Sequence, residues 1–430
     1  MSENTCIEIG NVCNIYQTEI QDIKMPLSLD STRAAGLVAM QLFVSEMGQR
    51  YASGRNFDHG MGNHTSVSGL SPYISRRLIT EQEVVSSALT AHGYDEAEKF
   101  IQEVFWRSYF KGWLELRPQV WDLYRDGLNS DLRSLGLDRG LRSDVSCAMA
   151  GKTGIACFDS WTVELLKTGY LHNHARMWFA SIWIFTLRLP WRLGADFFFR
   201  HLLDGDAASN TLSWRWVAGL HTRGRPYVAT AKNITTFSVQ RFSLKNSDLA
   251  NVARGLEATE PDGLPPVLPL RAVNYPLTTR PTALLITDED CQLEDFNIGD
   301  FDIRSTATLS ASHLRSALEV SERVLDFENA ALMDAAARIG LETIHLRADD
   351  PDVLLNWALA AGVTQIVTSY VTRGPLWDWL EQAKPKLSEH GIIIAEWQRD
   401  WDAAIWPYAT AGFFKVKKQV PDIIKKMLSA

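Results

Sequence analysis

The spacing of hydrophobic residues along the chain changes at a proline-rich segment, and this change constrains the fold more than any other feature of the sequence. From about residue 30 to residue 250, apolar residues recur at the spacing of helices. After residue 281, short apolar runs alternate with helical patterns of ten or more residues. Residues 251–281 are rich in proline and poor in helix formers, which is typical of a linker. The sequence therefore predicts two units of different architecture.

The first unit, residues 1–250, is predicted to be an all-helical domain. Thr80 and Glu83 have the three-residue spacing of a capping box, which marks the start of a helix. Residues 173–189 are apolar nearly all round, as expected of a buried helix. Continuous helices are expected over residues 30–52, 80–91, 95–116 and 173–189.

The second unit, residues 282–430, is predicted to be an α/β domain with a doubly wound parallel sheet. Strands are expected over residues 282–290, 342–348, 364–372 and 392–397. Helices are expected between them, over residues 313–340, 350–362 and 375–391. The glycine patterns of a P-loop and of a dinucleotide fingerprint are both missing from the sequence, so neither of these phosphate sites is expected.

Composition excludes several classes of protein. With 430 residues, 46% of them hydrophobic, the chain is long enough for two domains and too apolar for a disordered one. No run of eighteen apolar residues and no basic flank before an apolar stretch occur, so we expect a cytoplasmic protein without a membrane partner. Five scattered cysteines without a C-x-x-C pair predict neither a disulfide framework nor a metal site. A net charge of −8 argues against non-specific coating of nucleic acid, but it allows a local basic cleft.

Fifteen tryptophans are present, and nearly all lie between residues 106 and 216 or between residues 357 and 406. Packing in the core is the ordinary explanation, because tryptophan buries a large apolar area. Their clustering in one helical region also leaves a redox or stacking role open.

The most informative stretch is residues 168–219, where a set of polar and aromatic residues follows a fixed order. Its members are His172, Asn173, Arg176, Met177, Trp191, the Asp204–Gly205–Asp206 triplet, Asn210, Trp214 and Trp216. This order resembles the flavin-binding helical domain of the photolyase/cryptochrome family. Residues 68–84, 102–110 and 151–154 also match segments of that family. The resemblance covers about residues 35–245.

The resemblance implies FAD as the cofactor, bound without a covalent link. Its binding residues would be Tyr51, Ser68, Leu70, Ser71, Arg176, Asp204, Asp206 and Asn210. Hydroxyls and amides of the serine segment would hold the pyrophosphate, the Arg176–Asp204 ion pair would lie beside the flavin ring, and Asn210 would face flavin N5. Val67 replaces a threonine of the family, for which Thr65 or His64 would compensate. The plain alternatives are a serine helix cap and an Asp-capped loop.

Trp214 and Trp191 match the first two members of the family's electron-transfer chain. The third position falls near residue 138, where this sequence has no tryptophan. Either the chain leaves through Trp178 or Trp183, or photoreduction of the flavin is poor. The alternative is that both are core residues.

Glu103, Trp106 and Arg107 match family residues at the substrate cavity, and their spacing places them on one helix face. The resemblance makes Glu103 a catalytic hydrogen-bonding acid. It makes Trp106 and Trp216 stacking platforms for extruded bases, and Arg55 and Arg107 phosphate contacts. The alternative for Glu103 and Arg107 is a solvated pair on one helix.

Asn173 and Met177 are typical of the family members that act on cyclobutane dimers, whereas the 6-4 enzymes carry histidine at both positions. Catalytic roles would fall to Glu103, Asn210, Trp191 and Trp214. The sequence is therefore interpreted as a light-driven DNA photolyase, a lyase that repairs cyclobutane pyrimidine dimers in UV-damaged DNA with reduced FAD. The alternatives are a cryptochrome-like photoreceptor without repair and a flavoprotein with a light-independent role. A monomer is expected.

The family places its α/β antenna domain first, whereas here the α/β unit comes last. Residues 285–297, 347–397 and 412–428 resemble segments of that domain, which suggests a circular permutation. The arginines expected near the first strand are replaced by Asp288, Glu289 and Gln292. The antenna pigment is therefore unknown, and an unrelated doubly wound domain is the alternative.

Overall fold

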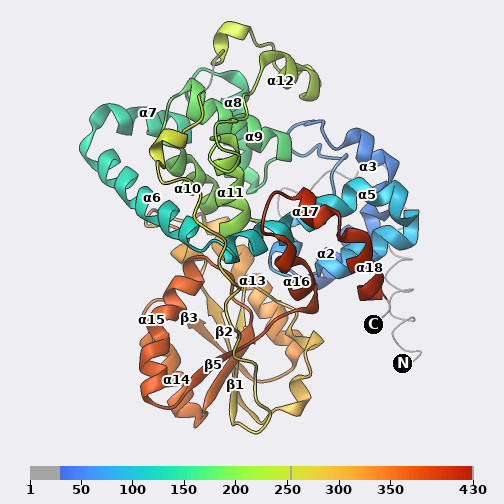
Figure 1. Ribbon diagram of the computed structural model, residues 1–430, viewed down its shortest axis with the longest axis vertical. Coiled ribbons are helices and arrows are strands. Elements are labelled where there is room, and N and C mark those ends of the chain that lie inside the picture. Colours follow the sequence, from blue (N-terminus) through green and yellow to red (C-terminus); the bar gives the residue numbers. More distant parts are fainter. Residues whose placement is uncertain (1–29, 252–253, 429–430) are drawn as a thin grey trace.

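The computed structural model describes residues 30–251 and 254–428, and it places a helical layer against a five-stranded parallel sheet (Figure 1). The helical layer contains α2 (Arg33–Phe43), α3 (Gln49–Gly54), α4 (Ser71–Ser75), α5 (Glu81–Glu115), α6 (Gln119–Leu137), α7 (Arg139–Met149), α8 (Ala156–Thr168), α9 (Asn173–Ser181), α10 (Trp191–His201), α11 (Ala207–Val217) and α12 (Ala231–Phe237). Cysteines 6 and 13, which enter the cysteine count above, lie outside the described residues.

The four helices predicted for the first unit have other bounds in the structure. The one expected over residues 173–189 is α9, which passes into a π-helical turn at Ile182–Thr186. The helix expected over residues 30–52 is broken, because α2 ends at Phe43 and a 3₁₀ turn separates it from α3. The helices expected over residues 80–91 and 95–116 are two arms of α5, which share an interruption at Gly93 with φ of 72° and ψ of 173°. The capping box of Thr80 is confirmed, since its hydroxyl accepts from the amide of Glu83 and the Glu83 carboxylate accepts in return.

The sheet has the strand order β3-β2-β1-β4-β5, and every neighbouring pair is parallel. Its strands are β1 (Thr282–Thr287), β2 (Ile303–Ser310), β3 (Thr343–Arg347), β4 (Gln365–Ser369) and β5 (Ile393–Trp397). Three long helices accompany them: α13 (Glu322–Ile339), α14 (Asp352–Ala361) and α15 (Pro375–Glu389).

Alternate residues of β1 belong to different cores. Leu284 and Ile286 pack in the cluster that contains Phe327 of α13, whereas Leu285 packs with Leu380 of α15. Both faces of the sheet are therefore covered, which explains the continuous apolar run of β1. The sequence did not predict β2, because its first half is polar and half-buried while only its second half is buried.

The end of the chain returns from the sheet to the helical layer. The short helices α16 (Asp400–Ile405), α17 (Phe414–Lys417) and α18 (Val420–Leu428) follow β5 and lie beside α5 and α2 (Figure 1). The Trp401 ring lies 4.8 Å from Phe105 of α5, and its indole N–H donates to Ser108 at 2.7 Å. Within the described ranges no helix has the length and apolar character needed to cross a membrane.

A buried arginine joins the two halves. Arg77 lies 2.8 Å from Asp402, 3.1 Å from Glu81 and 3.5 Å from Asp290, and all four side chains are buried. Its backbone has a φ of 49°, which is unusual for a residue other than glycine. Three carboxylates around one guanidinium therefore connect the segments that follow α4 and β1 to helices α5 and α16.

Candidate functional site

The second arm of α5, α9, and the loop between α10 and α11 meet on one side of the helical layer. Helix packing explains the meeting, because apolar residues of α5, α9 and α11 share one core cluster. Ion pairs between residues far apart in the sequence connect these elements. Each pair joins residues that the sequence assigned to the cofactor or to the substrate.

Arg176 of α9 and Asp204 of the following loop form the deepest of these pairs. Their side-chain atoms lie 2.9 Å apart, and Asp204 is only 3% exposed. Burial by itself would raise the pKa of Asp204, but Arg176, Arg107 and the Ser71 hydroxyl hold it below its ordinary value. The second oxygen of this carboxylate is buried and makes no hydrogen bond of good geometry with the described residues, although the Ser71 hydroxyl lies near the group. A charged, buried acceptor of this kind can take a hydrogen bond from a ligand.

Tyr51 of α3 is a buried ring near Arg55 and Glu103. Its ring meets Phe100 edge-on at 5.1 Å and Phe43 at 6.4 Å. Burial, together with the nearby charge of Glu103, raises the pKa of Tyr51, so the phenol stays protonated at neutral pH.

Glu103 and Arg107 do not pair with each other, although they share a face of α5. Glu103 pairs with Arg55 of the loop after α3, and Arg107 lies 2.7 Å from Asp206. The alternative of a solvated pair on one helix is therefore wrong. Each of the four side chains pairs with a residue of another element. A ligand that binds one member of a pair must therefore also offset the charge of the member that is left without its partner.

The two tryptophans predicted at the substrate cavity each have one covered face. Phe413, from the segment before α17, stacks on Trp106 with 4.0 Å between ring centroids and 16° between planes. Tyr227 stacks on Trp216 at 5.2 Å and 26°. Stacking on a base is therefore limited to the free face of each ring. Asn173 is exposed and Met177 is half-buried, so α9 presents both toward solvent.

The serine segment lies at the start of α4. The amide of Leu70 donates to the Ser68 hydroxyl at 3.3 Å, which bends the chain before Ser71. Ser68 and Ser71 are half-buried, whereas Leu70 is fully buried and belongs to the core. Leu70 can therefore contribute its backbone to a ligand site but not its side chain.

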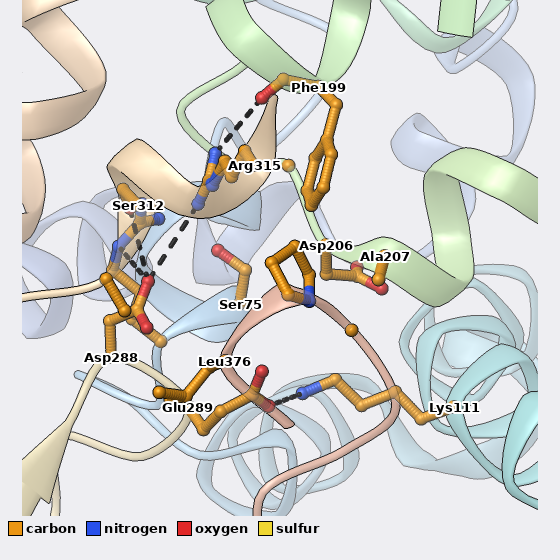
Figure 2. Close-up of a pocket in the computed structure, with 15 residues that line it drawn as sticks. Ser75, Lys111, Phe199, Asp206, Ala207, Asp288, Glu289, Ser312, Arg315 and Leu376 are labelled. Atoms are coloured by element: carbon orange, nitrogen blue, oxygen red, sulfur yellow. Dashed lines mark hydrogen bonds and ion pairs between the residues drawn. The ribbon is translucent and has the colours of Figure 1, made fainter. Parts of the chain in front are cut away.

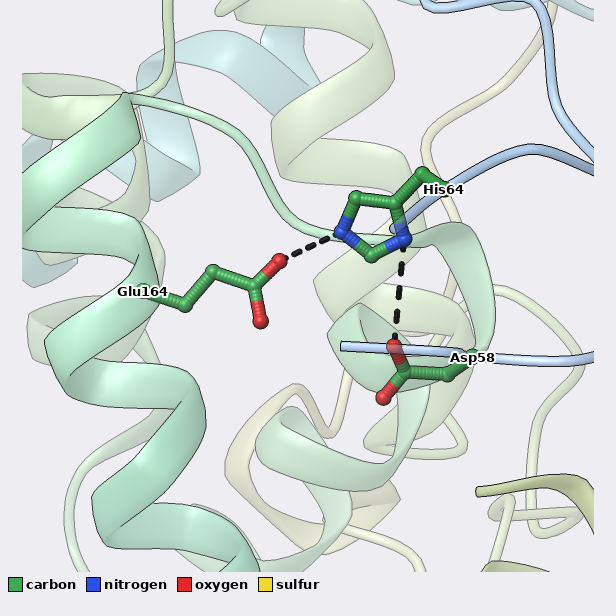
Figure 3. A group of neighbouring side chains, drawn as sticks. All are labelled: Asp58, His64 and Glu164. Atoms are coloured by element: carbon green, nitrogen blue, oxygen red, sulfur yellow. Dashed lines mark hydrogen bonds and ion pairs between the residues drawn. The ribbon is translucent and has the colours of Figure 1, made fainter. Parts of the chain in front are cut away.

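His64 is not available to replace the missing threonine at position 67. Its Nε2 lies 2.5 Å from Glu164 and its Nδ1 lies 3.9 Å from Asp58, with all three side chains buried (Figure 3). Asp58 also accepts from the indole of Trp161 at 2.9 Å and pairs with Arg241. Because the two carboxylates face opposite nitrogens of one ring, the group bridges two elements rather than converging on a single ion (Figure 3).

Asn210 and the predicted electron-transfer tryptophans lie in the core between α10 and α11. The Asn210 amide donates to the carbonyl of Ala195 at 2.8 Å, which fixes its orientation. Trp214 contacts Phe198 at 5.1 Å and Trp183 at 6.3 Å. Trp191 instead contacts Tyr124 of α6 at 5.8 Å.

A pocket lies between the two halves, where the carboxyl ends of β1, β2 and β4 face the helical layer (Figure 2). Asp206 is the one predicted site residue among those lining it. Lys111 pairs with Glu289 across the pocket at 3.2 Å, and Arg315 lies 3.9 Å from Asp288 on the other wall (Figure 2). Glu289 therefore pairs with the helical half through Lys111, and Asp288 lies 3.8 Å from Arg76 of the same half.

Sequence reasoning missed two groups near the site. It missed Phe413, because the packing of a C-terminal segment on α5 leaves no local signal. It also missed Trp121 and Tyr124, whose three-residue spacing places both rings on one face of α6, a helix that the sequence analysis did not predict.

Comparison with known families supports a flavin site in the helical layer. Residues 100–245 match the family model of the FAD binding domain of DNA photolyase. A deoxyribodipyrimidine photo-lyase from Streptomyces griseus is 34% identical over 165 residues, which cover 37% of this chain and 34% of that protein. A protein of the same name from Thermus thermophilus is 30% identical over 216 residues, covering 48% of this chain and 47% of its own. The chain thus spans less than half the length of these two relatives.

Two solved structures are also similar. A bacterial class III photolyase from Agrobacterium tumefaciens matches with a TM-score of 0.41 and 24% identity, over 51% of this chain and 44% of its own. A cryptochrome from Synechocystis matches with a TM-score of 0.39 and 24% identity, over 49% of this chain and 44% of its own.

The residues present fit FAD by their chemistry. Asp204 offers an unused, buried acceptor, and Arg176 beside it offers a positive charge. Half-buried serine hydroxyls near them suit a pyrophosphate, and the ring of Tyr51 supplies an apolar wall. A cofactor with an aromatic ring, polar edges and two phosphates uses all of these groups.

Proposed function

Because its helical half belongs to the photolyase/cryptochrome family and carries that family's FAD-binding domain, we propose that this protein is a light-driven DNA photolyase acting on cyclobutane pyrimidine dimers. The observation that carries the proposal is the arrangement of Arg107, Arg176, Asp204 and Asp206 around one unused buried acceptor. The proposed cofactor residues and the proposed substrate residues meet at the Arg107–Asp206 pair.

When bound, reduced FAD supplies the blue-light absorption and the electron that splits the dimer. The chain's own residues orient and shield this chemistry. Asp204 would accept a hydrogen bond from the cofactor, while Arg176 keeps the carboxylate ionised. Tyr51, buried and protonated, excludes water from one side. The amide of Asn210, fixed by the Ala195 carbonyl, keeps its oxygen available as an acceptor.

Binding of damaged DNA would replace two ion pairs within the protein by ion pairs with DNA phosphates. Arg55 and Arg107 now neutralise Glu103 and Asp206. In the proposal, damaged DNA draws both arginines to its phosphates, and Glu103 turns to the carbonyl of a flipped dimer. A carboxylic acid at this place stabilises the charge that the dimer gains, so it acts mainly in the transition state.

The proposal includes a circular permutation, with residues 1–250 as the helical domain, 251–281 as the linker and 282–430 as the antenna-like domain. Two observations support it. All neighbouring strands are parallel and both sheet faces are covered. The last segment, from α16 to α18, packs on α5, where it bridges the sheet to the helical layer.

Repair per absorbed photon, measured with chemically pre-reduced protein and a dimer-containing oligonucleotide, tests the function. Glu103→Gln should lower the repair yield while leaving FAD affinity near that of the wild type. Arg107→Gln should weaken DNA binding and reduce its salt dependence, because fewer counterions are released. Flavin-loaded wild-type protein that neither prefers damaged DNA nor repairs it would contradict the photolyase assignment.

That result would support the second candidate, a cryptochrome-like photoreceptor without repair. The observation that favours it is the covered face of Trp106, on which Phe413 stacks at 4.0 Å. If Phe413 blocks the substrate side, Phe413→Ala should raise affinity for damaged DNA. An unchanged affinity would show that the free face of Trp106 suffices.

A further inference from the structure

Three buried aromatic side chains form a continuous row from the start of α10 to the contact of α6 with α15. The Trp191 ring, at the start of α10, lies 5.8 Å from Tyr124 of α6. The Tyr124 ring lies 5.4 Å from Trp121, with 30° between their planes. Short gaps between oxidisable rings allow an electron to move in steps.

The inner end of the row lies next to Trp214. A methyl group added at Gly194 of α10 would lie only 2.4 Å from the Trp214 ring, so Trp214 packs directly on that helix. Trp191 and Gly194 are three residues apart in α10 and therefore share a face. The row thus begins one helical turn from the proposed first donor.

At the outer end of the row, the Trp121 indole has a carboxylate as its hydrogen-bond partner, unlike the other two rings. The indole N–H of Trp121 donates to the Asp378 carboxylate at 2.9 Å, and Asp378 of α15 has a side chain that is 25% exposed. The Tyr124 hydroxyl and the Trp191 indole have no hydrogen-bond partner among the described residues. An oxidised indole is a strong acid, so only Trp121 can pass its proton to a base already in contact.

We propose that Trp121 is the terminal electron donor of the chain and takes the place of the tryptophan missing at Asp138, a residue that instead caps α7. The proposal rests on the proposed flavin site. When bound, photoexcited oxidised FAD would supply the one-electron oxidant, and Trp214 and Trp191 would pass one electron to it. One electron from Trp121 refills the row, and the indole proton moves to Asp378. An external thiol then returns one electron to Trp121, and the proton returns from Asp378.

The two other exits expected from the sequence end inside the protein. Trp183 is fully buried, and its further ring contacts, besides Trp214, are to the phenylalanines Phe158, Phe179 and Phe197. Trp178 stacks on Trp161 at 5.5 Å, and both are fully buried. Among the described residues, Trp183 leads to no ring that pairs with a carboxylate. Trp161 donates only to Asp58, which is fully buried, whereas the Asp378 side chain is 25% exposed.

Flash photolysis of the full-length protein with oxidised FAD tests the assignment, with the neutral tryptophanyl radical followed by its absorption. Trp121→Phe should abolish the long-lived radical, and Asp378→Asn should shorten its lifetime because the proton cannot leave. Trp357→Phe is the matched control, since Trp357 is also buried and donates to a polar partner, Ser305, at 2.9 Å in the other half. Peptide mass spectrometry after illumination without thiol should find oxidised indole at Trp121.

The outcomes separate this inference from the proposed function. An unchanged radical in flavin-loaded Trp121→Phe protein, or oxidation mapped to Trp178 or Trp183, would overturn the inference and leave the flavin assignment intact. Purified protein that never retains FAD would overturn both. Tyr124→Phe should keep the radical, because Tyr124 has no proton acceptor among the described residues and serves only as a bridge.

Discussion

Two Arg–Asp ion pairs with the same separation differ in what surrounds the aspartate, so we expect substitution of the two aspartates to have different effects on cofactor binding. Arg176–Asp204 and Arg192–Asp131 are both Arg–Asp pairs of 2.9 Å in the helical layer. Of these two aspartates, Asp204 is the one with a buried oxygen that makes no hydrogen bond of good geometry with the described residues.

Asp204→Asn is therefore expected to weaken FAD binding, because it removes the charge that holds Arg176 and offers a donor where an acceptor is needed. The loss should be about 1–3 kcal/mol, the usual result of leaving a buried polar group without its partner. Isothermal titration of the apoprotein with FAD measures it. Asp131→Asn is the control, and equal affinities in the two variants would contradict the site.

Acid should destabilise the protein through histidines that fold in the neutral form. Burial lowers the pKa of His172 to about 3 and the pKa values of His201 and His221 to about 4. Below pH 6.5 the unfolded chain takes up protons that the folded chain does not, so the free energy of unfolding should fall as pH falls from 6.5 toward 4.

His172→Asn tests this dependence at one residue. Asparagine keeps the helix-capping function that the His172 ring performs for α9, but it does not titrate. Urea unfolding at several pH values should therefore show a shallower acid slope than that of the wild type. Identical slopes would mean that His172 is already charged in the folded protein.

Among the elements, α5 is the one on which the site and both halves depend, and it contains a break that only glycine adopts without strain. Gly93 has φ of 72° and ψ of 173°, and open space surrounds its Cα. Gly93→Ala should therefore lower stability through backbone strain alone, by about 1–3 kcal/mol.

Gly136 of α6 provides the matched control for this element. It also faces open space, but its backbone is helical. Gly136→Ala should raise stability by about 0.5–1 kcal/mol, since alanine loses less entropy on folding. Thermal unfolding of both variants measures the difference, and a shift in the same direction would show that the break in α5 is not strained.

At the scale of the whole molecule, buried charge joins the halves in addition to the apolar core that they share. Arg77→Met would leave Glu81, Asp290 and Asp402 close together without their shared cation. The expected cost is about 3–5 kcal/mol, as for other broken buried pairs. Arg304→Met, which removes an exposed pair with Asp302, should cost about 0–1 kcal/mol. Urea unfolding measures both, and equal losses would refute a special role for Arg77.

The sequence by itself determined what local chemistry controls. Hydrophobic periodicity predicted a helical half and an α/β half, and the capping box of Thr80 was predicted from spacing alone, because caps, turns and amphipathic faces form between residues close in the chain. Tertiary structure decided the rest. β2 pairs with β1 and β3 although only half of its residues are buried. Phe413 stacks on Trp106. Glu103 and Arg107, which share one helix face, pair with Arg55 and Asp206 instead of with each other. Those contacts join residues tens to hundreds of positions apart, and their energies depend on burial and charge that exist only once the chain has folded.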